Sequence, residues 1–598
     1  MEQLLERKNI EERYKWSTEA MFATDDEWER EFQSVAQTVE ADLFATMRGH
    51  LQEGASTVLL YLTTSEEIER RLGVLHIYAH MKNDQDTREQ IYQAMLSRVQ
   101  MMAAVLAEQT SFFEPEILAL PSDALAAYVQ SEELAPYRHL MDNIIRHKPH
   151  VLSSETEAVL ASLSDTLGSE GDVFSLLTNA DFDHGSISVE EEEYKVTEGR
   201  MGLLLRNPNR EVRRLTYERV YDTYLAHKNT VASLYAYNVK TDVAVARVKK
   251  FSSAREMALF SKRIPESVYD ALIAGVKENL SYHHRYLELR KKVLGLDSVR
   301  MYDKYVPLAA EERKHYDFAE GFALVKEGLR PLGDEYGAIL DQAVSDRWID
   351  VYESAGKRSG AYSTGFYATK PYVLLNYQGE YDSVSTLAHE LGHSMHSYLT
   401  WHTQPPHYAH YSIFLAEIAS TVNETLLVNH LLRTTDDQKL RASLINQQLD
   451  SMTATIYRQT MFAEFEWLAH RRVEEGQALT HDTLCELYGS LNDEYHGSAF
   501  ARDGRSSAEW SRIPHFYHSY YVYQYATGMS AALAFAERIL NGGSQNVDKY
   551  LGFLRSGAKD YPLEVLKEAG LDMTDPTIVT QGLSMYGELL KEMESLIG

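Results

Sequence analysis

Apolar residues recur at spacings of three and four along most of this chain, which is the pattern of amphipathic helices. Residues 25–160 repeat the pattern in segments such as SVAQTVEADLFATMRGHLQEGASTVLLYLTT and REQIYQAMLSRVQMMAAVLAEQTSFF. It resumes with NREVRRLTYERVYDTYLAHKNTVASLYAYNVKTDVAVARVKK and continues to about residue 345. The chain is therefore predicted to be mainly α-helical, with the helices packed in bundles.

Two stretches interrupt the helical pattern. Residues 167–197 contain glycines, an acidic run and a short alternating segment, which predicts a hairpin or linker. We therefore expect a domain boundary near residue 200, between a helical amino-terminal domain (1–200) and a second domain (201–598). Residues 354–383 combine glycines with alternating aromatic and β-branched residues, which predicts two or three short strands in a small β-sheet.

Composition narrows the class of protein. The 598 residues carry a formal charge of −29, which argues against nucleic acid or an anionic membrane as the main partner. No stretch reaches roughly 18 uninterrupted apolar residues, and the amino terminus has no apolar signal segment. The single cysteine, Cys485, excludes an intrachain disulfide and a thiolate-rich zinc site. These features predict a cytoplasmic protein.

The ten residues LAHELGHSMH, 387–396, follow the predicted strands and contain an H-E-x-x-H motif. On a helix, the i, i+4 spacing places His389 and His393 on one face, where two imidazole nitrogens can meet one metal ion. Glu390, the next residue on the helix, is expected to lie beside the coordination position of that ion that the protein leaves open. At ordinary residue frequencies the pattern arises by chance about 0.1 times in a chain of this length, so the motif needs further support.

A catalytic zinc site needs a third protein ligand and an open position for water. The metzincin extension fails here, because His396 stands where glycine is required and Leu399 where the third histidine should be. His396 also falls on the ligand side of the helix, seven residues after His389. We expect it to pack in the structure or to contact one of the metal ligands, and not to bind the metal itself.

A second predicted helix, YSIFLAEIASTVNETLLVNHLL at residues 411–432, offers the missing ligand. It places Glu417 and Glu424 two turns apart on one stripe, with no basic residue between Ile413 and Leu432. Two carboxylates among apolar residues are costly unless a positive group lies beside them. Glu417 is therefore the candidate third ligand, and Glu424 a candidate acceptor for an imidazole N–H.

A tyrosine-rich stretch, WSRIPHFYHSYYVYQYATGM at residues 510–529, contains five tyrosines and two histidines. One interpretation is an aromatic helix face in the core. The other is a set of donors directed at an oxyanion opposite the metal, since a phenol or an imidazole can supply such a donor. The candidates are His515, Tyr520 and Tyr523, with Tyr521 and Tyr525 as close alternatives.

The motifs together resemble the thimet-oligopeptidase-like zinc metallopeptidases, and specifically the oligoendopeptidase F branch. The matching pieces are AHELGHSMHS, YSIFLAEIASTVNETLL, IPHFYHSYYVYQYATG and, upstream, NREVRRLTYERVYDTYLAHKNTVASL. They span about residues 205–530, and the helical amino-terminal third is also similar to the family. Animal relatives have a glycine-rich loop after the matching histidine, whereas HFYHSYYVYQY contains no glycine.

The resemblance implies a two-lobed helical body enclosing a channel that admits short unfolded peptides. It implies that His389, His393 and Glu417 bind one zinc ion and that Glu390 is the general base. It also implies that His515 and nearby tyrosines assist the transition state. The function expected is hydrolysis of internal peptide bonds by metal-activated water.

A hypothesis for substrate binding comes from GKRSGAYSTG, residues 356–365. This segment could offer an edge strand to an extended peptide backbone, with Gly360 and Tyr362 near the peptide.

Two other functions are weighed. Glu390 and His393 also form the Glu-x-x-His element of di-iron carboxylate bundles, but that design needs a second element. Glu466 and His470 are one residue too far apart to supply it, and Asp181 and His184 lie in the glycine-broken stretch. A catalytically inactive peptide-binding protein is the second alternative, and the intact Glu390 argues against it.

Overall fold

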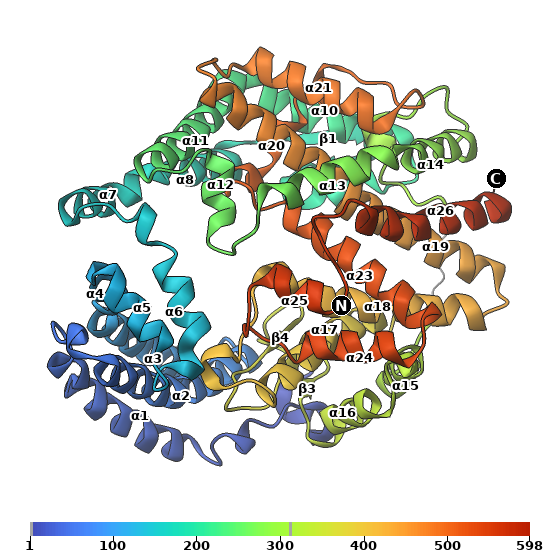
Figure 1. Cartoon of the computed structure of the whole chain (residues 1–598). Coiled ribbons are helices and arrows are strands. Elements are labelled where there is room, and N and C mark those ends of the chain that lie inside the picture. Colours follow the sequence, from blue (N-terminus) through green and yellow to red (C-terminus); the bar gives the residue numbers. More distant parts are fainter. Residues whose placement is uncertain (1–3, 310–313, 598) are drawn as a thin grey trace. The chain divides into compact units, whose positions relative to one another are not determined.

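The computed structural model describes residues 4–309 and 314–597, and its internal contacts define two compact units (Figure 1). Unit 1 comprises residues 1–149, 313–431 and 535–570, and unit 2 comprises residues 150–312, 432–534 and 571–598. Both units are mainly helical, as the apolar periodicity predicts. The change of unit nearest to the predicted domain boundary lies between Pro149 and His150, and the boundary near residue 200 stays a prediction.

Unit 1 contains two groups of helices and a small sheet. Its helices are α1 (Asp25–Glu40), α2 (Ala55–Gln85), α3 (Gln90–Thr110), α4 (Phe113–Ala119), α5 (Ser122–Gln130), α6 (Arg138–Ile145), α15 (Phe318–Gly328), α16 (Asp334–Ser345), α17 (Tyr381–Trp401), most of α18 (Ile413–Thr434), α24 (Ser544–Leu554) and α25 (Pro562–Glu568). Its strands are β3 (Ile349–Asp350), β4 (Tyr362–Thr364) and β5 (Tyr372–Leu374).

Unit 2 is a helical assembly with one hairpin. Its helices are α7 (Ser154–Leu167), α8 (Ser169–Leu176), α9 (Glu198–Leu205), α10 (Arg210–Ala226), α11 (Lys228–Val248), α12 (Ala254–Phe260), α13 (Glu266–Glu278), α14 (Leu280–Val293), α19 (Gln438–Met452), α20 (Arg458–Glu474), α21 (His481–His496), α22 (Gly504–Ser507) and α26 (Thr577–Ile597), while α23 (Tyr523–Asn541) spans a change of unit. The hairpin is β1 (Ser186–Val189) with β2 (Glu192–Lys195), and it confirms the turn predicted within residues 167–197.

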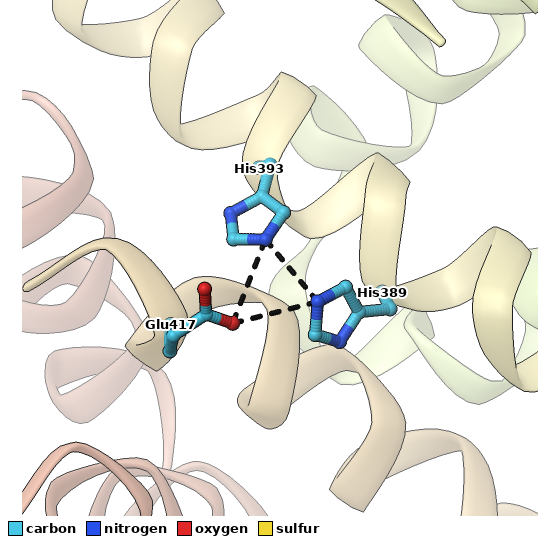
Figure 2. A group of neighbouring side chains, drawn as sticks. All are labelled: His389, His393 and Glu417. Atoms are coloured by element: carbon cyan, nitrogen blue, oxygen red, sulfur yellow. Dashed lines mark hydrogen bonds and ion pairs between the residues drawn. The ribbon is translucent and has the colours of Figure 1, made fainter. Parts of the chain in front are cut away.

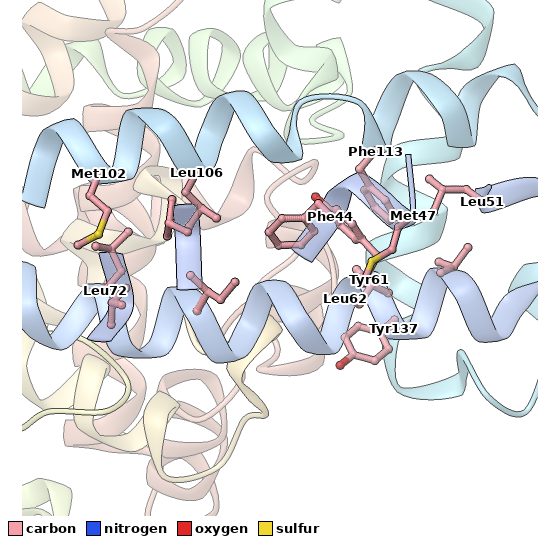
Figure 3. Close-up of a cluster of buried hydrophobic side chains, with 14 of the residues drawn as sticks. Phe44, Met47, Leu51, Tyr61, Leu62, Leu72, Met102, Leu106, Phe113 and Tyr137 are labelled. Carbon is pink, nitrogen blue, oxygen red and sulfur yellow. The ribbon is translucent and has the colours of Figure 1, made fainter. Parts of the chain in front are cut away.

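The amino-terminal helices of unit 1 share one apolar core, whose residues Figure 3 shows in part. Leu72 of α2 and Leu106 of α3 belong to this core. At the other end of the cluster, the rings of Tyr61 and Phe113 stack with their centroids 3.9 Å apart. The indole N–H of Trp28 donates to the carbonyl of Leu75, so the buried polar atom of this large side chain is satisfied.

A three-stranded sheet in the order β3-β5-β4 precedes the motif helix, where the sequence predicts short strands. Strand β5 lies in the middle, parallel to β3 and antiparallel to β4, and is fully buried. Its Tyr372 and Leu374 pack with Trp16 of the amino-terminal segment and Ile77 of α2. Strand β4 therefore lies at an edge of the sheet. None of the helices in residues 4–309 and 314–597 combines the length and apolar character that a membrane crossing requires.

Candidate metal centre and active site

Helices α17 and α18 carry the predicted ligands and cross at close range. A Cβ atom added at Gly392 would lie 2.6 Å from the Cα of Ser420, so the glycine of the motif permits the crossing. The side-chain amide of Asn423 donates to the carbonyl of Ala388 and ties the two buried faces together. Close packing at Gly392 therefore sets the distance between the motif and the downstream carboxylates.

Three ligand atoms converge from these helices (Figure 2). The Nε2 atoms of His389 and His393 lie 3.2 Å apart, and Oε2 of Glu417 lies 3.4 Å from the first and 3.6 Å from the second. Zinc bonds of about 2.0–2.1 Å in a tetrahedron place neighbouring ligand atoms roughly 3.3 Å apart. The three residues therefore fit a divalent metal. Within the described residues, no other set of three His, Cys, Asp or Glu side chains meets this spacing.

The second carboxylate of α18 orients one of the imidazoles. Nδ1 of His389 lies 3.1 Å from Oε1 of Glu424, so the ring donates there and directs the lone pair of Nε2 toward the other two ligand atoms. Burial lowers the pKa of His389, but Glu424, Glu390 and Glu417 outweigh burial and raise it. Burial, with a further contribution from His389, lowers the pKa of His393 to about 4, which favours the neutral ring that binds a metal.

Glu390 lies beside the ligand atoms in a largely buried position. Burial raises its pKa to about 7, while His389 and the backbone of Ser363 act in the opposite direction. Ser363 belongs to strand β4, and its hydroxyl lies 2.9 Å from the hydroxyl of Ser394, one turn after Glu390 on α17. The edge strand and the motif glutamate are thus neighbours.

His396 occupies a different environment from the motif histidines. Its ring is buried and stacks on Tyr411 with centroids 3.7 Å apart, and Phe553 packs against the same ring. Burial lowers the pKa of His396 to about 3, so the ring is neutral. These contacts agree with a structural role in the packing of α17.

The predicted substrate-binding segment is anchored to α2. The hydroxyl of Tyr362 donates to Oδ2 of Asp84, a fully buried carboxylate that also pairs with Arg358. Gly360 has φ +86, and its carbonyl accepts from the side-chain amide of Asn376. The turn before β4 therefore needs glycine, and Tyr362 is held by the protein itself.

The predicted donors His515, Tyr520 and Tyr523 belong to unit 2. His515 is exposed. Partial burial of its ring is the main reason that its pKa is lowered, and Arg458 acts in the same direction. The rings of Tyr520 and Tyr523 are buried in this unit, where both contact the ring of Tyr269. Tyr521 and Tyr525 are half-buried, and the ring of Tyr525 lies 6.2 Å from that of His515. The roles of these residues stay predictions.

A polar cluster, which we call the loop clamp, holds the backbone of this segment. It consists of Asp242 on α11 with Glu466 and His470 on α20. Two of its carboxyl groups accept hydrogen bonds from Ser519 and Tyr520. Tyr520 has φ +58, a strained conformation for a residue that is not glycine. Its N–H donates to Oε1 of Glu466 at 2.6 Å, and the Ser519 hydroxyl donates to Oδ2 of Asp242 at 2.5 Å. The clamp gives a glycine-free segment the turn that glycine commonly makes.

Sequence reasoning missed Gly392, Ser363 and the loop clamp. A glycine in the middle of an apolar helix was the available signal for the crossing of α17 and α18. In the sequence, Glu466 and His470 stand out only as a pair one residue too far apart for a Glu-x-x-His metal element. Nothing in the local sequence signals that Ser363 lies beside Glu390, since that contact depends on the pairing of β4.

Comparisons with known proteins identify the family of the chain. A family model described as peptidase family M3 matches residues 203–585, and one described as oligopeptidase F matches residues 116–183. The chain is similar to oligopeptidase PepF of Bacillus subtilis, with 43% identity over all of this chain and 89% of that protein. It is 41% identical to group B oligopeptidase PepB of Streptococcus agalactiae, over 99% of this chain and 98% of that protein.

Solved structures support the same relationship. A peptidase structure from Chlamydophila abortus superposes with a TM-score of 0.96 at 36% identity and covers all of both chains. Oligoendopeptidase F from Enterococcus faecium superposes with a TM-score of 0.72 at 37% identity, over 96% of this chain and 99% of that chain. The di-iron interpretation has no support in these matches. The chain belongs to peptidase family M3 and is a metallopeptidase.

Proposed function

We propose that this metallopeptidase is a zinc-dependent oligopeptidase that hydrolyses internal bonds of short unfolded peptides. The observation that carries the proposal is the triangle of ligand atoms from His389, His393 and Glu417, with sides of 3.2, 3.4 and 3.6 Å. Three ligands leave one position of a tetrahedral site open, as catalytic zinc requires. We propose one zinc ion per chain at this site.

The proposed mechanism assigns proton transfer to Glu390. His389, His393 and Glu417 would hold a zinc ion, which would supply Lewis-acid polarisation of the scissile carbonyl and would lower the pKa of a water molecule to about 7. Glu390 accepts a proton from the attacking water and returns it to the leaving amine, as general base and then general acid. The raised pKa of Glu390 suits a group that both takes up and releases a proton near neutrality.

His515 and a tyrosine of the late segment are the proposed donors to the oxyanion. Loss of one such donor typically costs about 10²–10³ in rate. Because Tyr520 and Tyr523 are buried, the half-buried Tyr521 and Tyr525 compete with them for the tyrosine role. Replacing each tyrosine by phenylalanine and comparing kcat identifies the donor, and unchanged kcat in all four variants would remove the role.

Glu390→Gln tests the catalytic assignment most directly. The variant should keep its zinc and lose about 10²–10⁴ of turnover, because the amide cannot accept the water proton. Asp382→Asn also replaces a carboxylate of α17 by its amide, but at an exposed position, and it should leave turnover unchanged. Zinc is measured by elemental analysis, and cleavage by mass spectrometry of a peptide library with and without chelator. A zinc-loaded Glu390→Gln enzyme with normal turnover would remove the general-base role.

Strand β4 is the proposed docking edge for the substrate backbone. It is one of the two outer strands of its sheet and lies beside Glu390. Gly360→Pro should raise KM several-fold at unchanged zinc content, because proline cannot adopt φ +86 at the turn before β4. Gly295→Pro introduces the same kind of backbone strain, at φ +62 in unit 2. This control separates the effect of strain from an effect on substrate docking. Equal KM values in the two variants and the wild type would refute docking at β4.

We also propose a cytoplasmic location. The one cysteine, Cys485, is free in the structure, as suits a reducing compartment. Cell fractionation with antibody detection tests this location, and recovery from the extracellular medium would contradict it.

A further inference from the structure

Unit 2 contains a pocket of about 180 Å³ whose wall combines aromatic rings with cationic side chains. Its wall is formed by parts of α14, α19, α20 and α21, by Arg206 at the end of α9, by the segment after Asp303, and by η12 (Thr453–Tyr457). The last is a π-helical turn between α19 and α20, and such turns are frequent at functional sites. The metal ligands belong to unit 1, so the pocket is built from other residues.

Lys304 supplies a positive charge to this pocket, and the carboxylate of Glu509 acts on that charge only at longer range. Its Nζ lies 2.5 Å from Nε2 of His496. Nδ1 of His496 donates to the carbonyl of Asn492, so Nε2 carries the lone pair and accepts from Lys304. The partner of the lysine is thus a neutral ring. Within the described residues, Lys304 forms no ion pair with a carboxylate.

The carboxylates near the pocket are engaged elsewhere. Glu509 accepts from Arg458 and from the hydroxyl of Tyr488, each at 2.7 Å. Asp450 pairs with Arg290 at 3.3 Å and also accepts from the Tyr286 hydroxyl. Each acid therefore has an arginine of its own, and the charge of Lys304 remains in excess.

An excess cation withdrawn from water is costly unless an anion reaches it. Burial lowers the pKa of Lys304 to about 8, which reflects that cost and leaves the group charged at neutral pH. A second polar atom in the wall is also unmatched, since the buried Nδ1 of His283 has no hydrogen-bond partner among the described residues.

The remaining wall selects the kind of anion. The ring of His283 stacks on Tyr457, and Ala454 and Met461 add apolar surface. The charge of Lys304 matches one carboxylate, and apolar walls match a carbon chain better than a bare inorganic ion. In a chain with a net charge of −29, an excess of positive charge in an apolar pocket is a specific feature.

We propose that this pocket binds an organic carboxylate, with Lys304 as its charge partner. The carboxylate can come from a free organic acid or from the C-terminus of a peptide, and the chemistry of recognition is the same. The site is additional to the proposed catalytic centre, and it does not depend on which peptides that centre cleaves.

The test compares ligands that differ only in charge. Butyrate and butyramide are titrated into the intact zinc-loaded protein, and binding is followed by ligand-detected NMR. Butyrate should bind about tenfold to a hundredfold more tightly than butyramide, since hydrogen bonds to charged groups are stronger than neutral ones. N-acetyl-alanyl-alanine and its C-terminal amide form a second pair. Preference for the acid in this pair alone identifies a peptide terminus as the source.

Variants assign the preference to the pocket. Lys304→Met should abolish the preference for the acid, and Lys304→Arg, which keeps the charge, should retain it. Lys291→Met removes a half-exposed lysine from α14 and should leave the preference unchanged. Equal binding of acid and amide by the wild type in both pairs would overturn the proposal without any variant. Retention of the preference by a folded Lys304→Met protein would also overturn it.

Discussion

Two groups of imidazoles and carboxylates in this chain use the same residue types for opposite purposes. In the loop clamp of unit 2, each carboxylate meets donors of the protein: Glu466 accepts from the backbone of Tyr520, and Asp242 accepts from Ser519 and contacts His470. In the metal centre of unit 1, the facing atoms of His389, His393 and Glu417 are acceptors. Acceptors that converge without a donor between them mark a cation site.

Exposure separates Glu417 from Glu466, whereas Asp242 of the clamp and His389 of the candidate metal centre are equally exposed at 28%. The side chain of Glu417 is 45% exposed, whereas Glu466 is 1% exposed. A metal that meets substrate needs access, while a clamp that fixes a turn works best when water cannot compete for its hydrogen bonds. The convergence of acceptor atoms, more than residue type, therefore distinguishes the candidate metal centre from the loop clamp.

Removal of Glu417 should give the largest effect. Glu417→Ala leaves two imidazoles on one helix, so zinc occupancy and turnover should fall nearly to background. Elemental analysis after dialysis measures occupancy, and peptide cleavage measures turnover. Glu417→Gln keeps the shape and loses the charge, and it should lie close to the alanine variant. Full zinc occupancy in Glu417→Ala would move the third ligand elsewhere and weaken the contrast with the clamp.

Glu424 should give an intermediate effect, since it would act on a bound metal only through His389. Its carboxylate accepts the Nδ1–H of His389 at 3.1 Å, and loss of such a partner typically costs about 10–100-fold in metal affinity or activity. Glu424→Gln should therefore bind zinc more weakly than the wild type and more tightly than Glu417→Ala. Competition with a chelator of known affinity measures both. An affinity equal to that of the wild type would show that Glu424 does not orient the ring.

The sequence predicts which three side chains converge in the candidate metal centre, because that information is local. The spacing of His389 and His393 needs only a helix, and the pair Glu417 and Glu424 needs only a second helix of apolar character. What brings the two helices together is Gly392, whose missing side chain lets α17 reach Ser420. Gly392 can be seen in the motif, but the apolar periodicity does not specify that Ser420 packs against it.

The late aromatic segment contains a structural feature that the sequence does not predict. Helical spacing makes Tyr520 and Tyr523 as plausible as Tyr521 and Tyr525, yet the segment contains a turn at positive φ that changes which rings are buried. That turn depends on Glu466, which lies 54 residues earlier in the chain. Contacts of this kind are set by the packing of α20 and leave no local pattern.

The loop clamp itself should respond least in activity and mainly in stability. Glu466→Ala leaves the Tyr520 N–H buried without an acceptor and should lower the free energy of unfolding by about 1–3 kcal/mol. Zinc content should not change. Glu466→Gln retains an acceptor oxygen and should cost less than the alanine variant.

The pH dependence of these variants sharpens the contrast. Burial is the main reason that the pKa of Glu466 is raised well above 4.5, with Asp242 adding to the shift and the Tyr520 N–H opposing it. The folded protein therefore holds a proton that the unfolded chain releases above about pH 4.5, so the stability contributed by Glu466 is complete below that pH and declines as pH rises. Relative to Glu466→Gln, which cannot titrate, the wild type should lose stability between pH 5 and pH 8 in denaturant unfolding. A constant difference across that range would mean that Glu466 is already ionised in the folded protein. Its buried charge would then need a cation beside it, and the contrast with the candidate metal centre would be lost.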